Sequence, residues 1–439
     1  MSLVYTINIG VTKMSKNIET ISLHEGYDVE PTSGSRSVPI YQTTSYVFKD
    51  TDHAANLFGL KEFGNIYTRI MNPTTDVLEK RCAALEAGTS ALCTASGMSA
   101  IFLAIHTICS AGDHIISSAS LYGGTDTLFR YTLPRMGIKV DLVEDMTPEK
   151  VESLIQDNTK CIYYEVYGNP KGDVLDMTGI SEVAKKYNIP VMIDNTFAPT
   201  LCQPVQFGAN IVIHSLTKWI GGHGTSIGGV LIDTGTFDWS SGRFSEFTDP
   251  DPRYHGLKLW DTFGNFPDVG NIAFSIKARV HGLRNIGMAM SPSNAFHFLQ
   301  GFETLPMRMD KHVENTRLFA DWLKNHDQIE WVNYSGFSDH PSYDHAQKYL
   351  SGRVPSVFTF GVKGGYESGK KFIETVKLAS HLANVGDAKT LVIHPSSTTH
   401  SQLGDAEQLA AGVTQDMVRV SVGLEHIDDI KADFDAALV

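Results

Sequence analysis

Short apolar runs separated by longer amphipathic stretches dominate the chain between about residues 76 and 230. Runs of three or four apolar residues are too short for helices and match buried strands, whereas the stretches between them repeat at helical spacing. Strands that alternate with helical segments predict βαβ units, an α/β fold and a mainly parallel sheet. The expected strands are Ala91–Cys93, His114–Ser117, Cys161–Tyr164, Pro190–Ile193 and Ile211–Ile213.

Local signals predict where some helices begin and end. Thr147, Pro148 and Glu149 supply an N-cap residue, a first-turn proline and a first-turn acid, so a helix should start there. The polar segment 185–188 should close another helix just before the next strand. Long helical patterns resume near Ala273.

The chain divides into three segments of different composition. Residues 1–75 are rich in Ser, Thr, Gly and Asn, show little periodicity and are interpreted as an arm rather than a domain. Residues 76–298 would form a large domain, interrupted at about 233–270 by a stretch dense in Gly, Pro and aromatic residues. There we expect an ordered insertion without regular structure. Residues 299–439 would form a smaller C-terminal domain.

Composition and charge exclude several classes of protein. A chain of 439 residues that is 42% hydrophobic can bury a large core. A formal net charge of −13 argues against nucleic-acid binding, because no excess of Lys and Arg is available for phosphates. No apolar run reaches the length of a membrane span. The first residues lack the pattern of a signal peptide, and Met1 and Met14 both stay open as the start.

The five cysteines are widely spaced and form no CxxC pair. This usage favours reduced thiols over a disulfide or zinc framework, and therefore a cytoplasmic protein.

Polar chemistry follows each expected strand, which matters because ligands of open α/β sheets bind at the carboxyl ends of the strands. The most informative case is Lys218, which lies just beyond a strand and between the hydroxyl residues Ser215 and Thr217. A lysine amine can form an imine with a cofactor aldehyde while hydroxyl groups bind a phosphate tail. Taken alone, such a lysine is more often a solvated surface charge.

Four other strand ends add matching chemistry. Gly97 and Met98 open a helix whose N-terminal amides could bind an anion, although a plain strand-to-helix turn has the same sequence. Tyr122 beside paired glycines could stack on a planar ring, or could be an ordinary loop residue. Asn169 could donate a hydrogen bond to a ring oxygen, or could be a turn residue. Asp194 could keep a pyridine nitrogen protonated, or could be a helix cap.

Together these residues describe a site for a phosphorylated pyridine cofactor, because each weak signal lies at the same predicted sheet edge. A nicotinamide or nucleotide site is disfavoured, since neither GxGxxG nor GxxxxGK[ST] is present. Four histidines are candidate metal ligands, but their spacing fits no common metal site, so no metal is expected. They are His214, His223, His394 and His400. His223 is interpreted as a structural residue that holds the loop after Lys218.

From about Thr20 to Glu425 the chain resembles the pyridoxal-phosphate (PLP) enzymes of cysteine and methionine metabolism, the transsulfuration family of fold type I. The resemblance implies an aspartate-aminotransferase-like α/β fold with a mainly parallel sheet and a smaller C-terminal α+β domain. Its motifs are Tyr67-Thr68-Arg69 with Asn72-Pro73-Thr74, Ser96-Gly97-Met98, Asp194-Asn195-Thr196, Ser215-Leu216-Thr217-Lys218, His394-Pro395 with Thr398-Thr399-His400, and Arg419-Val420-Ser421-Val422-Gly423.

The resemblance implies a role for each matching residue. Lys218 would hold PLP as an imine and act in catalysis, Asp194 would pair with the ring nitrogen, and Tyr122 would stack on the ring and assist proton transfer. The phosphate would be bound by Gly97, Met98, Ser215 and Thr217, with Asn169 beside the ring oxygen. Tyr67 and Arg69 would reach the phosphate in a neighbouring subunit. The substrate would contact Arg419 through its α-carboxylate, and also Asn384 and Tyr67.

Three features resemble the family members that add sulfide to O-acetylhomoserine, a γ-replacement that yields homocysteine and acetate. Residues 384–390 stand where lyases of the family carry a Ser-Leu-Gly-Gly type run. The other two features are the aromatic insertion, with Tyr254-His255-Gly256-Leu257, and the segment 65–74. One departure is Glu165-Val166-Tyr167-Gly168-Asn169-Pro170, where many members have Ser-Pro after the Glu.

Several alternatives stay open. Cystathionine γ-synthesis or γ-elimination would use the same cofactor and the same residues. A non-catalytic binding or scaffold protein is argued against by the intact Lys218, Asp194 and Arg419. The sequence does not decide among acetyl, succinyl and phospho leaving groups, or between sulfide and methanethiol. The resemblance implies a homo-oligomer that is at least a dimer; tetramers are usual in the family, but the sequence does not decide between dimer and tetramer.

Overall fold

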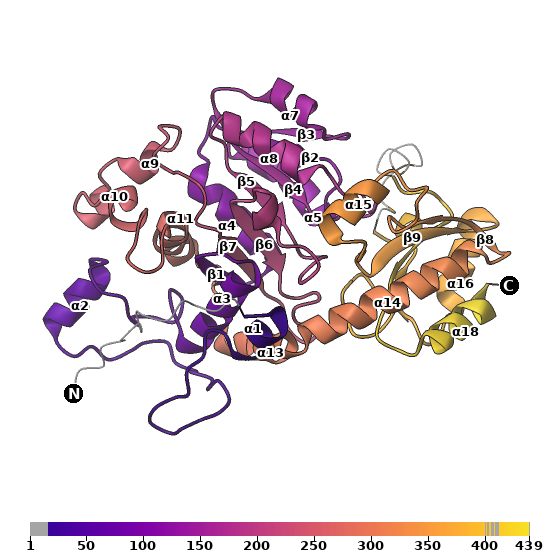
Figure 1. Ribbon diagram of the computed structural model, residues 1–439, viewed down its shortest axis with the longest axis horizontal. Coiled ribbons are helices and arrows are strands. Elements are labelled where there is room, and N and C mark those ends of the chain that lie inside the picture. Colours follow the sequence, from indigo (N-terminus) through magenta and orange to yellow (C-terminus); the bar gives the residue numbers. More distant parts are fainter. Residues whose placement is uncertain (1–15, 400, 402–403, 405–407, 409–411, 439) are drawn as a thin grey trace.

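The computed structural model contains two β-sheets, and the long helix α14 (Leu305–Lys324) runs along the smaller, C-terminal one (Figure 1). The structure describes residues 16–438, apart from 400, 402–403, 405–407 and 409–411. Met1, Met14 and His400 therefore lie outside the described residues. Within the described chain, no helix is both long and apolar enough to cross a membrane.

The larger sheet has seven strands and is mainly parallel. Neighbours β6, β5, β4, β2 and β3 run parallel, whereas β7 is antiparallel to both β6 and β1. The order across the sheet is β1 (Ser90–Thr94), β7 (Gly229–Asp233), β6 (Ile211–Ser215), β5 (Val191–Asp194), β4 (Thr159–Glu165), β2 (His114–Ser118) and β3 (Lys139–Val143).

The smaller sheet lies in the C-terminal part of the chain and has five strands. It is antiparallel except for the pair β10 and β11. Its order is β10 (Ser380–His381), β11 (Leu391–Ile393), β12 (Met417–Ser421), β9 (Val357–Val362) and β8 (Ile329–Asn333). The expected α/β fold with a mainly parallel sheet and a smaller C-terminal α+β part is confirmed.

The helices flank both sheets (Figure 1). The α-helices up to the end of the large sheet are α1 (Ile18–His24), α2 (Thr51–Phe58), α3 (Pro73–Leu85), α4 (Gly97–Ile108), α5 (Gly123–Thr127), α6 (Leu133–Arg135), α7 (Pro148–Leu154) and α8 (Met177–Lys186). Those that follow are α9 (Ser245–Thr248), α10 (Leu259–Phe263), α11 (Ala273–Lys277), α12 (Arg284–Ile286), α13 (Pro292–Glu303), α15 (Tyr343–Leu350), α16 (Gly365–Thr375) and α18 (Ile427–Ala437). The π-helices η1 (Leu128–Thr132) and η4 (Ala278–Leu283) join α5 to α6 and α11 to α12, and the 3-10 turns are η2 (Pro204–Phe207), η3 (Pro252–Tyr254) and η5 (Pro395–Ser397).

The large sheet is buried on both faces, which explains why its strands read as continuous apolar runs. Helices α3 and α8 cover one face, and α4, α11 and η4 cover the other. All five strands expected from the sequence are present, and the Thr147 side chain caps α7 by accepting from Lys150 N at 3.3 Å. Strands β3 and β7 were not expected. The charged residues Lys139 and Asp141 interrupt the apolar pattern of β3, and β7 follows a glycine-rich segment.

The insertion at 233–270 contains regular structure, so the expectation of none is wrong there. Helices α9 and α10 and the turn η3 are each five residues or shorter, too short to show helical periodicity in the sequence. The fully buried Trp239 stacks on Phe247 of α9, with ring centroids 4.7 Å apart, and on Phe274 of α11, with centroids 5.3 Å apart. Aromatic packing therefore orders this segment.

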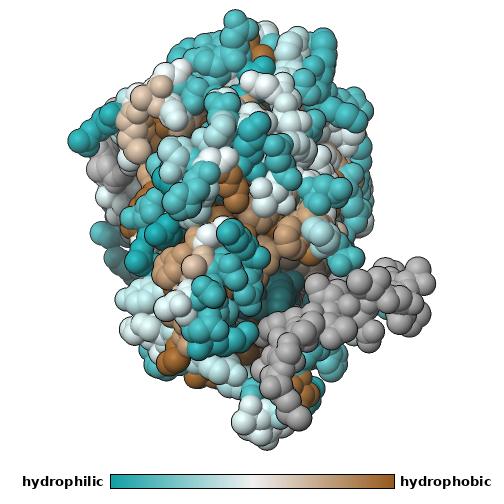
Figure 2. All heavy atoms as spheres, turned by 90° about the vertical axis from the view of Figure 1, so that its left-hand side faces the viewer, coloured by the Kyte–Doolittle hydropathy of each residue, from teal (hydrophilic) through white to brown (hydrophobic). Residues whose placement is uncertain are grey.

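Helix α2 projects from the body of the molecule beside α10 (Figure 1). Figure 2 shows this side of the molecule, where hydrophilic residues predominate and apolar residues gather in a band across the middle. Helix α2 begins at an N-cap, because the Asp50 carboxylate accepts from His53 N at 2.7 Å.

Candidate functional site

The predicted site residues gather where β1, β2, β4, β5 and β6 end, at one edge of the large sheet. Ser96 caps α4 by accepting from Ser99 N at 3.1 Å, so the first amides of this twelve-residue helix face the sheet edge without an acidic neighbour. Gly97 packs against Ser215, since a Cβ on Gly97 would lie 2.7 Å from the Ser215 Cβ. Gly97 therefore lets helix and strand approach closely and leaves a polar cradle that fits a phosphate.

Thr217 completes this cradle from the turn that follows β6. Its hydroxyl accepts from Gly228 N at 3.1 Å and is held by the start of β7. Met98 lies on the other side, where its sulfur accepts from the Thr125 hydroxyl at 3.8 Å.

Lys218 follows the cradle and carries the most perturbed amine at this edge of the sheet. Its Nζ donates to the Asn384 Oδ1 atom. Burial, and then the nearby positive charge of Arg419, lower its pKa to about 8. A large fraction of this amine is therefore neutral, and nucleophilic, at mildly alkaline pH.

The lysine turn (residues 216–222) is held by the C-terminal part of the chain. Arg308 of α14 is buried, and its guanidinium donates to the carbonyls of Trp219 at 2.7 Å and Ile220 at 3.2 Å. Further contacts run from Trp219 Nε1 to Ser356 Oγ at 3.0 Å and from Ala388 N to Gly222 O at 2.8 Å. His223, which we expected to hold this loop, is exposed and makes no hydrogen bond within the described chain, so that expectation is wrong. The Arg308 guanidinium packs against Gly222 in its place.

Two carboxylates end adjacent strands and face the same side of the sheet. Glu165 of β4 and Asp194 of β5 are register partners. Asp194 Oδ1 accepts from Thr196 N at 2.9 Å. Loss of water around Asp194 raises its pKa, and the hydrogen bonds from Thr196 and the nearby His214 partly oppose this rise. Asp194 thus lies in surroundings where a cationic ring nitrogen would favour its ionised form.

Tyr122 presents an exposed ring on a loop anchored by Glu165. Its ring side chain is 52% exposed, while its backbone N–H donates to Glu165 Oε1 at 2.7 Å. Gly124 allows this arrangement, because a Cβ there would lie 2.6 Å from the Tyr122 ring and 3.3 Å from the Met98 sulfur. An aromatic face open to solvent at this point could stack on a planar ligand.

Arg419 and Asn169 meet on the side of the site that faces the smaller sheet. The Arg419 guanidinium, on β12, donates to Asn169 Oδ1 at 3.4 Å, a weak hydrogen bond. Burial lowers the pKa of Arg419 to about 10, so the group stays cationic near neutral pH. With only one long contact in the described chain, its guanidinium has donors left for a carboxylate.

Tyr67 and Arg69 contact each other and Arg284 rather than residues of the Lys218 cluster. Arg69 lies over the Tyr67 ring, 5.5 Å from its centroid, and donates to the Arg284 carbonyl. Both side chains are exposed, and within the described residues neither is hydrogen-bonded to a residue of the Lys218 cluster.

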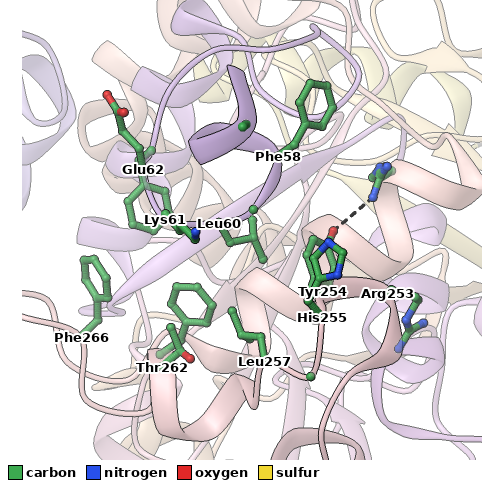
Figure 3. Close-up of a pocket in the computed structure, with 16 residues that line it drawn as sticks. Phe58, Leu60, Lys61, Glu62, Arg253, Tyr254, His255, Leu257, Thr262 and Phe266 are labelled. Atoms are coloured by element: carbon green, nitrogen blue, oxygen red, sulfur yellow. Dashed lines mark hydrogen bonds between the residues drawn. The ribbon is translucent and has the colours of Figure 1, made fainter. Parts of the chain in front are cut away.

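A pocket of about 1290 Å³ lies between the arm and the insertion (Figure 3). Phe58, Leu60, Leu257 and Phe266 contribute apolar walls. The Tyr254 hydroxyl accepts from the Arg284 guanidinium at 3.2 Å, as the dashed line in Figure 3 marks. None of the predicted site residues lines this pocket, so it is separate from the Lys218 cluster.

Sequence reasoning missed a buried polar pair behind the site. Glu86 at the end of α3 and His214 of β6 are both fully buried, and His214 Nε2 lies 2.7 Å from Glu86 Oε1. Asn195 Nδ2 donates to the same oxygen at 2.8 Å. The sequence offers no signal for this pair, because 128 positions separate the partners. His214, His223 and His394 do not gather: the described residues contain no group of three or more His, Cys, Asp or Glu able to hold a metal ion.

The chemistry of this donor set fits pyridoxal phosphate. The cradle at Gly97, Ser215 and Thr217 offers amides and hydroxyl groups to a phosphate. A low-pKa amine, a carboxylate and an exposed aromatic ring lie beyond it.

Comparison with known proteins agrees with this chemistry. Residues 19–439 match the family described as Cys/Met metabolism PLP-dependent enzyme. The chain is 57% identical over 424 residues to the O-acetyl-L-homoserine sulfhydrylase of Leptospira meyeri, which covers 96% of each protein. It is 51% identical over 428 residues to the homocysteine synthase of Schizosaccharomyces pombe, which covers 97% of this chain and 98% of that one.

A crystal structure from Campylobacter jejuni, described as a putative O-acetylhomoserine (thiol)-lyase, superposes with a TM-score of 0.91 at 39% identity. The match covers 96% of this chain and all of that one. That structure contains N′-pyridoxyl-lysine-5′-monophosphate, a lysine that carries the cofactor.

Proposed function

Because the chain belongs to the Cys/Met metabolism family of PLP-dependent enzymes, we propose that it converts O-acetyl-L-homoserine and sulfide to L-homocysteine and acetate. The observation that carries this proposal is the near-full-length identity to relatives named for that substrate and that product. The reaction is a γ-replacement: the bond from Cγ to acetate breaks and a bond from Cγ to sulfur forms. Its product places the enzyme in methionine and cysteine biosynthesis.

Eight residues at the strand ends would hold the cofactor. When bound, pyridoxal phosphate supplies an aldehyde that condenses with amines and a ring that withdraws electrons from the substrate Cα. Lys218 would bind the aldehyde, and Asp194 would keep the ring nitrogen protonated. Tyr122 would cover one face of the ring and exclude water. The phosphate would be bound by Gly97, Met98, Ser215 and Thr217, and Asn169 would lie at the ring oxygen.

The substrate would be oriented by cationic and amide groups opposite Lys218. Arg419 would bind the α-carboxylate, because its guanidinium can make two parallel hydrogen bonds to a carboxylate. Asn384 already accepts from Lys218 Nζ, so it lies where the substrate amino acid would reach the amine. The contact to Lys218 supports a role for Asn384 in substrate binding.

Lys218 would also move the protons. Once its amine is free, a pKa near 8 suits it to accept the Cα proton and then a Cβ proton, and to return both after sulfur has added. Tyr122 would assist near the departing acetate. If Tyr122→Phe kept full turnover with O-acetylhomoserine and sulfide, a proton-transfer role of its hydroxyl would be ruled out.

We further propose that the enzyme is a cytoplasmic homo-oligomer, at least a dimer and most simply a tetramer. All five cysteines are buried free thiols, as suits a reducing compartment. Among the described residues, Tyr67 and Arg69 contact each other and Arg284 rather than the Lys218 cluster of their own chain, which supports a role in a neighbouring subunit. In this view residues 1–75 form the arm that reaches the neighbour, 76–298 the PLP-binding domain and 299–439 the C-terminal domain. Light scattering coupled to size-exclusion chromatography measures the assembly directly.

The decisive experiment supplies the purified enzyme with O-acetylhomoserine and either sulfide or cysteine, with Lys218→Ala as the blank. We expect homocysteine from sulfide. Cystathionine formed from cysteine at an equal or higher rate would instead assign cystathionine γ-synthesis. Comparing O-acetyl-, O-succinyl- and O-phosphohomoserine, and sulfide with methanethiol, then identifies the preferred substrates.

A further inference from the structure

The hydroxyl of Tyr163 is a buried polar group that the proposed chemistry does not use. Tyr163 lies in the middle of β4 and is fully buried, and its hydroxyl has no hydrogen-bond partner among the described residues. A buried, unsatisfied hydroxyl costs free energy, so such a group calls for a physical explanation. Its ring is held in place by an edge-to-face contact with Phe129, with centroids 5.0 Å apart.

The sheet register places this hydroxyl on the side of Asp194. Tyr163 pairs with Met192, and two residues further along Glu165 pairs with Asp194. Because side chains alternate between faces, Tyr163, Glu165 and Asp194 share one face of the sheet. Tyr164, the next residue, points to the opposite face.

The electrostatics agree with this placement. Burial raises the pKa of Tyr163 well above its usual range, and the carboxylates of Asp194 and then Glu165 raise it further. The Tyr163 hydroxyl in turn acts to lower the pKa of Asp194. Thr125 of α5 is also fully buried, and it favours the ionised form of the same hydroxyl. The Tyr163 phenol is therefore neutral at neutral pH and can donate a hydrogen bond. Its acceptor would be the Asp194 carboxylate, which becomes fully ionised when the protonated ring nitrogen pairs with it.

We propose that Tyr163 is a positioning residue that donates its hydroxyl to Asp194 and thereby keeps the proton of that pair on the cofactor ring nitrogen. This inference rests on the proposed role of Asp194. A hydrogen bond to the ionised carboxylate makes Asp194 a weaker base, so the ring keeps its proton and withdraws electrons more strongly. Thr125 would orient the phenol. Tyr163 would thus act through Asp194 without touching substrate.

The test compares Tyr163→Phe with Tyr164→Phe in holoenzyme that carries pyridoxal phosphate labelled with ¹⁵N in the ring. Both substitutions remove one fully buried hydroxyl that lacks a hydrogen-bond partner, from adjacent positions of the same strand, but only one of these hydroxyl groups faces Asp194. The ¹⁵N chemical shift reports protonation of the ring nitrogen independently of activity. We expect Tyr163→Phe to move it toward the unprotonated value and Tyr164→Phe to leave it at the wild-type value.

A second readout is exchange of the Cα proton of a bound, unreactive amino acid into deuterium oxide. Tyr163→Phe should slow this exchange about tenfold, as expected for a shift of about one pKa unit in the Asp194 pair. Thr125→Val removes the hydroxyl that acts on the Tyr163 phenol. It should move the ¹⁵N chemical shift in the same direction as Tyr163→Phe, but by less, so it provides a second test if Tyr163→Phe folds poorly. A protonated ring in wild type with an unchanged shift in both variants would overturn the role of Tyr163 alone. An unprotonated ring in wild type would overturn the proposed role of Asp194 as well.

Discussion

Glu86 offers the sharpest test of what holds the sheet edge together. It is fully buried, and its Oε1 accepts from His214 Nε2 at 2.7 Å and from Asn195 Nδ2 at 2.8 Å. Glu86→Ala would remove this acceptor and leave the His214 donor unpaired, whereas Asn195 keeps its second bond to the Cys202 carbonyl at 3.0 Å. Breaking a buried, hydrogen-bonded pair of this kind costs about 3–5 kcal/mol. That is a large part of the roughly 5–15 kcal/mol by which a typical protein is stable.

Glu86→Gln separates the charge from the hydrogen bonds. The amide oxygen can still accept from both donors, so we expect a smaller cost of about 1–2 kcal/mol. The matched control is Glu314→Ala, which breaks the exposed pair with Lys311 at 2.9 Å. An exposed pair contributes little to stability, because water and salt screen its charges.

Thermal unfolding of the three variants, at equal protein and cofactor concentrations, measures these differences. We expect Glu86→Ala to lower the midpoint by roughly 3–5 °C, Glu86→Gln to lie between, and Glu314→Ala to stay near wild type. If Glu86→Ala unfolded within about 1 °C of Glu314→Ala, the pair would contribute nothing measurable and the reasoning from burial would fail.

Three further predictions concern the site itself. Gly97→Ala should weaken cofactor affinity at least tenfold and destabilise the enzyme by about 1–3 kcal/mol, because the new Cβ would lie 2.7 Å from the Ser215 Cβ. Ser215→Gly in the same chain should restore part of the stability. Fluorescence titration measures the affinity and unfolding curves measure the stability. The rate at which the apoenzyme captures the cofactor should rise with pH, with a midpoint at about 8, because the pKa of Lys218 is lowered and only the neutral amine attacks. Stopped-flow absorbance gives this profile. A midpoint near 10.5, the usual pKa of a lysine, would contradict the prediction. Asn384→Ala removes the acceptor of Lys218 Nζ and should shift that profile, whereas Asn294→Ala, at a half-buried asparagine that donates to the Ile227 carbonyl, should not. Arg419→Lys should raise KM for O-acetylhomoserine about tenfold or more, since a lysine keeps the charge but loses the two-point contact; an unchanged KM would place the α-carboxylate elsewhere.

The parts of the site that the sequence predicts are those encoded locally. Strands β4, β5 and β6 are short apolar runs, and Asn169, Asp194 and Lys218 lie at their ends or a few residues beyond them. The same local stretch of sequence therefore predicts both the strand and its polar residue. The insertion was harder, because helices of four or five residues give no periodicity to detect.

The contacts made at long range could not be predicted. The hydrogen bond from Lys218 to Asn384 spans 166 positions, and the pair of Glu86 and His214 spans 128. Such pairs depend on how the two sheets are placed against each other and on the order of strands within a sheet. No local pattern carries that information, and the loop expected to depend on His223 is in fact held by Arg308.

The way in which the lysine turn is held has a consequence for how the enzyme is made. Every group described above as holding that turn, from Arg308 to Ala388, is synthesised after the turn itself. A ribosome that has released the first 298 residues has already made Lys218 and the phosphate cradle, but none of the groups that hold the amine in place. We therefore expect stable cofactor capture to follow synthesis and docking of the C-terminal part of the chain.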